Sequence, residues 1–174
     1  MQMLAAGGLE PLTDGQRTAD EDNPKGYFEL EAVKSLAEDN AALQNADGKA
    51  VKVVLPLLRH VPPGKQYHVL LIERDLEEIF ASQKAMLDRH EAAVHDPSTL
   101  RPAYERLLRQ SRQMLTASPQ ARSLRLSHRW LIANPVAAAQ TIADFLGRPM
   151  DTAAMAACVD TKLHRQRAKT AATP

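Results

Sequence analysis

The chain has 174 residues, of which 44% are hydrophobic and 25% charged, a composition typical of one soluble globular domain. Its lysines and arginines number 22 against 21 aspartates and glutamates, and the formal net charge of +1 gives no global attraction to nucleic acid or an acidic membrane. Any anion-binding site must therefore be local.

The lack of a recognisable targeting signal and the single cysteine predict a cytoplasmic protein. No apolar run approaches the roughly 20 residues of a transmembrane helix, and the apolar start lacks the basic region of a signal peptide. The single cysteine, Cys158, has no partner for an internal disulfide and no other ligand at metal-binding spacing. We therefore expect a reducing compartment, no bound metal, and neither nucleic acid nor membrane as a partner.

In the first half of the chain, one strand has a clear sequence pattern, and the elements before it have less regular ones. The start, MQMLAAGG, is typical of the end of a helix closed by glycine, and a polar, turn-rich loop follows it. Residues 28–36 have apolar side chains at helical spacing, and residues 51–55 predict a short strand that Pro56 ends. The almost uninterrupted apolar run YHVLLIE, residues 67–73, predicts a strand buried in a parallel sheet.

The next predicted element is a helix that follows this strand directly. Asp75 and Glu78 have the spacing of a capping box, with aspartate in place of the usual serine or threonine. The helix should therefore begin at Leu76 and end near His90.

The last third of the chain predicts three helices and one strand. A long amphipathic helix begins at Ser98 or Pro102 and runs to about residue 115, and residues 123–127 alternate as a strand does. Asn134 and Gly147 mark the two ends of the next helix, with proline at its first position. Asp151 should cap a last short helix that ends near residue 159.

Strands that alternate with helices predict an α/β fold, a parallel sheet with helices on both faces. We expect residues 1–167 to form one domain and residues 168–174 a frayed tail. In such sheets ligands bind at the carboxyl ends of the strands, which is where Arg74 should lie.

Arg74 has two interpretations. It caps the sheet or pairs with Asp75 or Glu78, or its planar guanidinium binds a phosphate through two parallel hydrogen bonds. Ser82 lies about two helical turns further on, so its hydroxyl can donate to the same anion.

The segment RDLEEIFASQ, residues 74–83, resembles the part of sulfotransferases in which an arginine at a strand end and a serine on the next helix hold the 3′-phosphate of 3′-phosphoadenosine 5′-phosphosulfate (PAPS). Upstream, KVVLPLLRHVPPGKQYHVLLIERD looks like the family's strand, Leu-Pro turn and strand. Downstream, LSHRWLIANPVAAAQTIADFLGRPMD is similar to its Tyr-Glu-x-Leu, proline and Phe-Leu-Gly signature, and NPKGYFE matches a motif common in bacterial members. The resemblance extends from Met1 to about Arg167.

The resemblance implies a three-layer P-loop-type fold that transfers a sulfuryl group from PAPS to a hydroxyl or amine on a small molecule or glycan. Family members open with a strand and a loop whose backbone N–H groups bind the 5′-phosphosulfate. This sequence contains neither Gly-x-x-x-x-Gly-Lys-Ser/Thr nor Arg-Ser-Gly-Thr. We therefore expect a domain that lacks the first strand and the phosphate loop, either because the true start lies upstream or because the form is truncated, and weak or no catalysis by this chain.

The resemblance also assigns candidate donor-binding residues. Arg74 and Ser82 would hold the 3′-phosphate, and His128 stands where the family has a tyrosine that lies near the adenine. Arg165 or Arg167 would add positive charge to the 3′-phosphate site, the alternative being an exposed basic tail.

The catalytic base is a separate question. The family's histidine in Lys-x-His-Leu-Pro has no counterpart, because Lys52 is in register but Val54 takes the histidine's place. Glu29 is the substitute candidate, since other branches use a glutamate, although a carboxylate near a helix start also interacts with the helix dipole. His60 is a third candidate, the alternative being an inert surface histidine.

Two other functions are open from the sequence. A chain without the phosphate loop could be a non-catalytic, nucleotide-binding remnant of a sulfotransferase. A kinase-like phosphotransferase is the weaker alternative, because the sequence has no phosphate-loop lysine and no evident Mg²⁺-binding carboxylate.

Overall fold

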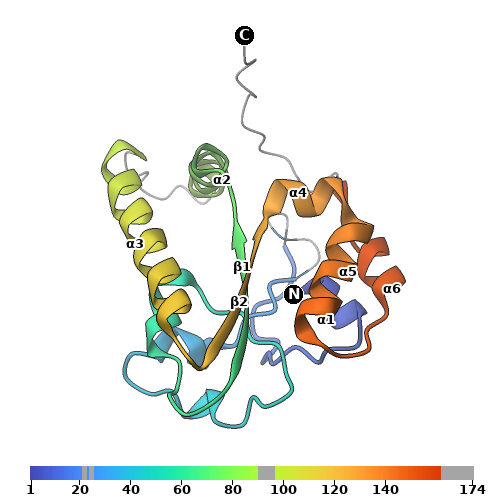
Figure 1. Cartoon of the computed structure of the whole chain (residues 1–174). Coiled ribbons are helices and arrows are strands. Elements are labelled where there is room, and N and C mark those ends of the chain that lie inside the picture. The colour runs from blue at the N-terminus through green and yellow to red at the C-terminus, as the bar shows by residue number, and fades with distance from the viewer. Residues whose placement is uncertain (21–22, 24–25, 90–96, 162–174) are drawn as a thin grey trace.

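A computed structural model describes residues 1–20, 23, 26–89 and 97–161. It is a mixed α/β structure in which two parallel strands are flanked by helices (Figure 1). The strands are β1 (Tyr67–Glu73) and β2 (Ala121–Ser127). The α-helices are α1 (Gln2–Ala6), α2 (Leu76–Arg89), α3 (Pro97–Ala117), α4 (His128–Ala133), α5 (Pro135–Leu146) and α6 (Thr152–Ala157). Three short 3-10 helices are η1 (Glu31–Ser35), η2 (Ala41–Leu43) and η3 (Leu55–His60).

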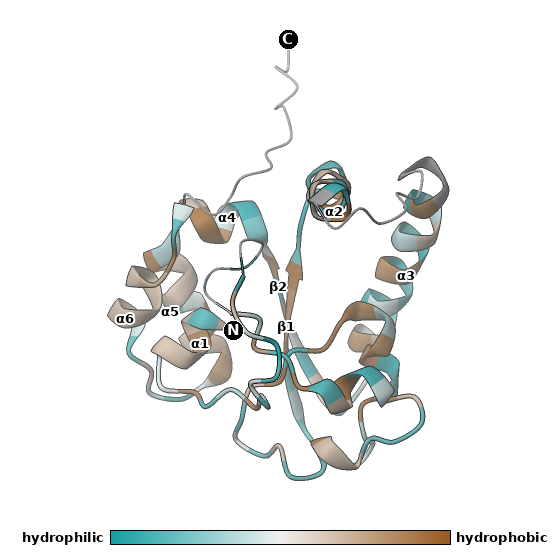
Figure 2. Cartoon of the chain, turned by 180° about the vertical axis from the view of Figure 1, so that it is seen from behind, coloured by the Kyte–Doolittle hydropathy of each residue, from teal (hydrophilic) through white to brown (hydrophobic). Residues whose placement is uncertain are grey.

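The two strands pair in parallel over their whole length, from Tyr67 opposite Ala121 to Glu73 opposite Ser127. The parallel pairing predicted from the apolar run is thus confirmed. Figure 2 shows a hydrophobic stretch in the later part of β1, after which the chain turns hydrophilic on its way into α2. Glu73 ends the strand and Arg74 follows it.

Helices lie on both sides of the strands (Figure 1). On one side, Leu124 and Leu126 of β2 belong to a core that α1, α5 and α6 complete with Met3, Ile142 and Met155. The opposite side carries α3, whose Leu115 is buried. Because side chains alternate along a strand, the even-numbered residues of both strands face α5 and the odd-numbered ones face α3.

The helix caps follow the sequence closely. Asp151 accepts a hydrogen bond from the Ala154 N–H at 2.8 Å, so it caps α6 as predicted, although the helix ends at residue 157. Gly147 ends α5 in the left-handed conformation with φ of 63°. The Asn134 side chain, however, donates to the Trp130 carbonyl instead of capping α5.

The other predicted helices are found with small changes in their bounds. The helix predicted from Leu76 begins there, and its predicted end at His90 lies outside the described residues. The long amphipathic helix begins at residue 97, earlier than predicted, so Pro102 lies within it. Helix α4 was missed because Ser127, the last residue of β2, also begins it: its hydroxyl accepts from the Trp130 N–H at 3.3 Å.

Two predictions in the first half of the chain are wrong. Residues 51–55 form no strand; the chain is extended at Val54 and then forms η3, with Pro56 in its first turn. Proline fixes φ and lacks an N–H, so it suits the first turn of a helix better than a sheet ladder. The helix predicted over residues 28–36 is only the short η1, and Phe28, with φ of 51°, lies outside any helix.

Candidate functional site

The carboxyl ends of the two strands form the candidate site. Glu73 and Ser127 end β1 and β2 and lie opposite each other in the parallel register. Arg74 and His128 are the next residues along the chain, so both lie at the same edge of the sheet. This is the edge at which ligands of open α/β sheets bind.

Arg74 is held by a buried carboxylate. Its Nε donates to Oε2 of Glu78 at 3.1 Å, and only 3% of Glu78 is exposed. The pairing interpretation of Arg74 is therefore present in the structure. The phosphate interpretation stays a prediction, since a guanidinium has five N–H donors and can bind more than one group.

Ser82 lies one helical turn beyond Glu78 on α2 and is half-buried. Residues four apart on a helix share a face, so Ser82 and Glu78 lie on one stripe of α2. Since Arg74 reaches Glu78 from the start of this stripe, the helix aligns the arginine, the carboxylate and the serine.

His128 is the first residue of α4 and is half-buried. It directly follows Ser127, which ends β2 opposite Glu73 of β1. Its contact with an adenine stays a prediction. Arg165 and Arg167 lie outside the described residues.

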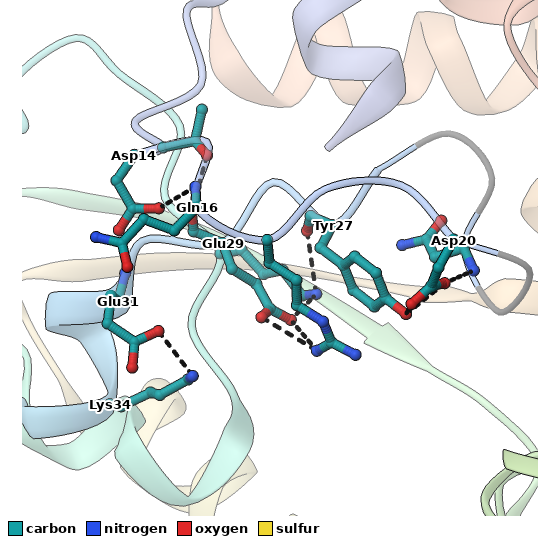
Figure 3. Close-up of polar contacts among 11 residues, drawn as sticks. Asp14, Gln16, Asp20, Tyr27, Glu29, Glu31 and Lys34 are labelled. Atoms are coloured by element: carbon teal, nitrogen blue, oxygen red, sulfur yellow. Dashed lines mark hydrogen bonds and ion pairs between the residues drawn. The ribbon is translucent and has the colours of Figure 1, made fainter. Parts of the chain in front are cut away.

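Glu29 lies between two cations (Figure 3). Lys52 Nζ donates to Oε1 at 2.9 Å, and Arg17 Nη1 donates to Oε2 at 3.3 Å. Partial burial raises the pKa of Glu29, but the hydrogen bonds and charges of Lys52 and Arg17 outweigh it, and the pKa lies below its ordinary value. A carboxylate with a lowered pKa accepts protons poorly, so in this arrangement Glu29 is a weak base.

The same cluster orders the loop before η1. Arg17 stacks on the ring of Tyr27, with its Cζ 3.4 Å from the ring centroid. The Tyr27 hydroxyl donates to the carboxylate of Asp20 at 2.7 and 2.8 Å (Figure 3). Burial and this hydrogen bond raise the pKa of Tyr27 despite the nearby Arg17. Sequence reasoning missed Arg17 and Asp20, since only the fold brings them to Tyr27.

Asp14 fixes the other end of this loop. Its carboxylate accepts from the Glu31 N–H at 2.6 Å and from the Gln16 N–H at 3.1 Å (Figure 3). The hydrogen bond from Glu31, followed by that from Gln16, lowers the pKa of Asp14. Asp14 thus holds the start of η1.

The other positions considered for the catalytic base are Val54, which replaces the family's histidine, and His60. Val54, in the place of the family's histidine, is 51% exposed. His60 ends η3, and its Nε2 accepts from the Nε of Arg59 at 3.0 Å. Lys52, by contrast, belongs to the Glu29 cluster, where it also donates to the Tyr27 carbonyl at 3.2 Å.

Within the described ranges, no three His, Cys, Asp or Glu side chains gather as metal ligands would. None of the helices seen in those parts of the chain is both long and apolar enough to span a membrane.

The fold and the strand edge define a mixed α/β protein with an arginine, a serine and a histidine near the carboxyl ends of a parallel strand pair. No family model, no curated protein and no solved structure matches the chain.

Proposed function

We propose that the chain is a sulfotransferase-family domain of the three-layer P-loop type, which binds PAPS at the carboxyl edge of β1 and β2. The observation that supports this best is the placement of Arg74 and His128 directly after the paired strand ends, with Ser82 on the following helix. An edge of this kind is the usual ligand-binding edge of a parallel sheet.

The proposed donor site uses charge and hydrogen bonding together. The terminal nitrogens of Arg74 would bind the 3′-phosphate, and the Ser82 hydroxyl would donate to the same group. Glu78 holds the Nε side of the guanidinium at 3.1 Å and so limits its orientation. The ring of His128 would lie against the adenine.

The proposed reaction is a direct in-line transfer. An acceptor hydroxyl or amine, on a small molecule or a glycan, attacks sulfur and forms the new bond to it. The bond between sulfur and the bridging phosphate oxygen breaks, and adenosine 3′,5′-bisphosphate leaves. The acceptor proton goes to a base, for which Glu29 is the candidate once its contacts with Lys52 and Arg17 are released.

A second candidate is nucleotide binding without catalysis. One observation favours it: the hydrogen bonds and charges of Lys52 and Arg17 lower the pKa of Glu29, so Glu29 accepts a proton poorly. In this case Arg74 and Ser82 would keep their binding roles, whereas Glu29 would serve only to order its loop.

Calorimetry with adenosine 3′,5′-bisphosphate and adenosine 5′-monophosphate tests the proposed binding site. We expect the bisphosphate to bind at least about tenfold more tightly, which corresponds to roughly 1.4 kcal/mol for the 3′-phosphate. Equal affinities, or no binding of either nucleotide, would contradict both candidates. Release of the bisphosphate from PAPS in the presence of a mixed set of phenols, alcohols and amines then separates the enzyme from the binding protein.

A further inference from the structure

The outer edge of β2 has no strand beside it in the described parts of the chain. The Tyr67 N–H donates to the Gln120 carbonyl at 2.7 Å. This bond shows which residues of β2 direct their backbone N–H and C=O groups toward β1. Because successive backbone groups of a strand point to opposite sides, Ser123 and Arg125 direct their N–H and C=O groups away from β1, and Ser127 directs its N–H the same way, while its carbonyl begins α4. All three residues are exposed. The edge can therefore accept a further strand.

A cavity of about 540 Å³ lies along this edge, between β2 and α3. Leu71 of β1 and Leu115 of α3 form the apolar part of its wall. Ser123 and Thr116 add hydroxyl groups to the wall. An extended segment paired with the edge would direct alternate side chains toward α3, into this cavity.

The positive charge of the cavity wall indicates which kind of partner would bind there. Arg112 binds Glu73 through Nε at 2.8 Å and Nη2 at 2.6 Å, so these two charges neutralise each other. Arg125, also in the wall, is exposed, and no ion pair or hydrogen bond of its guanidinium occurs among the described residues. Arg109 is exposed one helical turn from Arg112 on α3. The surface therefore favours an acidic side chain.

The same charge disfavours a second copy of the chain as the occupant. A twofold pairing of two β2 edges would place the two Arg125 side chains on one face of the joined sheet, close to each other. Like charges on neighbouring strands are destabilising. An acidic partner has no such penalty.

We propose that the outer edge of β2 binds an extended segment of another protein by strand addition, with apolar and acidic side chains directed into the cavity beside α3. Backbone hydrogen bonds to the edge would supply affinity, and the leucine-lined cavity together with Arg125 would supply specificity. This interaction surface is separate from the proposed transfer reaction.

Fluorescence anisotropy with a labelled synthetic peptide, Thr-Val-Thr-Glu-Thr-Val-Thr, tests the proposal. Its valines and glutamate share one face of a strand, as the cavity requires. We expect saturable binding that weakens at least about tenfold when lysine replaces the glutamate. A peptide with prolines at the two inner threonines should not bind, because proline disrupts strand pairing.

The matched variants are Arg125→Glu and Arg122→Glu. Both residues are exposed on β2, but Arg122 faces α5, where its Cζ lies 5.6 Å from the Phe145 ring centroid. Arg125→Glu should weaken binding at least about tenfold and Arg125→Gln by less, whereas Arg122→Glu should change it less than about twofold. Circular dichroism confirms that each variant is folded.

Four results would overturn the proposal. The first is no saturation up to about 1 mM peptide. The second is equal binding of the glutamate and lysine peptides, and the third is an equal effect of Arg125→Glu and Arg122→Glu. The fourth is a dimer in sedimentation experiments that excess peptide dissociates, which would show that the edge pairs with a second copy.

Discussion

The Nε of Arg74 donates to the carboxylate of Glu78 at 3.1 Å, and this carboxylate is almost fully buried. The arginine itself is less buried, with 23% of its side chain exposed. A buried carboxylate needs a partner, because burial without one costs free energy. Glu78 therefore fixes Arg74 at the strand end whether or not an anion binds there.

The pair should contribute to stability. In Glu78→Ala, Arg74 loses its buried partner, and we expect the free energy of unfolding to fall by about 1–3 kcal/mol. Urea unfolding followed by circular dichroism measures the loss. The control is Glu77→Ala on the same helix, where the side chain is 68% exposed and pairs with Arg101. It should lose less than about 1 kcal/mol, and equal losses in the two variants would contradict the structural role of Glu78.

The Glu29 cluster should make stability depend on pH. Its pKa is lower in the folded protein than its ordinary value of 4.5, so its stabilising contribution is present above pH 4.5 and is lost as the pH falls through the folded-state pKa. Glu29→Gln should therefore cost about 0.5–1 kcal/mol at pH 7, because both partners are partly exposed, and progressively less toward pH 3.

The test is to measure the urea unfolding midpoints of the wild type and Glu29→Gln from pH 7 to pH 3. The difference between the two midpoints should shrink as the pH falls. Glu38→Gln is the control, since Glu38 is an exposed glutamate on the surface after η1. A difference between Glu29→Gln and the wild type that stays constant over the whole range would contradict the assigned ion pairs.

Close packing of α1 against α6 requires a glycine at position 7. A Cβ there would lie 2.7 Å from Met155 Sδ and 2.8 Å from Met150 Cε, and Met155 is fully buried. Gly7→Ala should lower the free energy of unfolding by about 1–3 kcal/mol through overpacking. If the clash is the cause, Met150→Ala in the Gly7→Ala background should restore part of the loss. An unchanged unfolding midpoint in Gly7→Ala would show that the two helices can separate.

The sequence predicted most of the second half of the fold for physical reasons. The uninterrupted apolar run of β1 and the cap residue Asp151 act locally, so their patterns specify their structures. The first half was harder. Apolar residues at positions 51–55 suit a strand, but Pro56 lies in the first turn of η3. The helix predicted over residues 28–36 is only η1, and it begins after Phe28, whose φ is positive.

The candidate site was predictable only in part. Arg74 and Ser82 are close in sequence, and Glu78, which pairs with Arg74, shares a face of α2 with Ser82. The contacts of Glu29 with Lys52 and Arg17 join residues that are far apart along the chain. Such pairs depend on the path of the loop, which no local periodicity specifies.

The central claim is that Arg74 binds the 3′-phosphate of the donor nucleotide. Calorimetry with adenosine 3′,5′-bisphosphate and adenosine 5′-monophosphate, on the wild type, Arg74→Ala and the exposed control Arg148→Ala, tests it most directly. We predict that Arg74→Ala loses about 1.5–3 kcal/mol of affinity for the bisphosphate and almost none for the monophosphate, while Arg148→Ala binds both as the wild type does. Equal bisphosphate affinity in the wild type and Arg74→Ala would contradict the account, and so would an equal loss for both nucleotides.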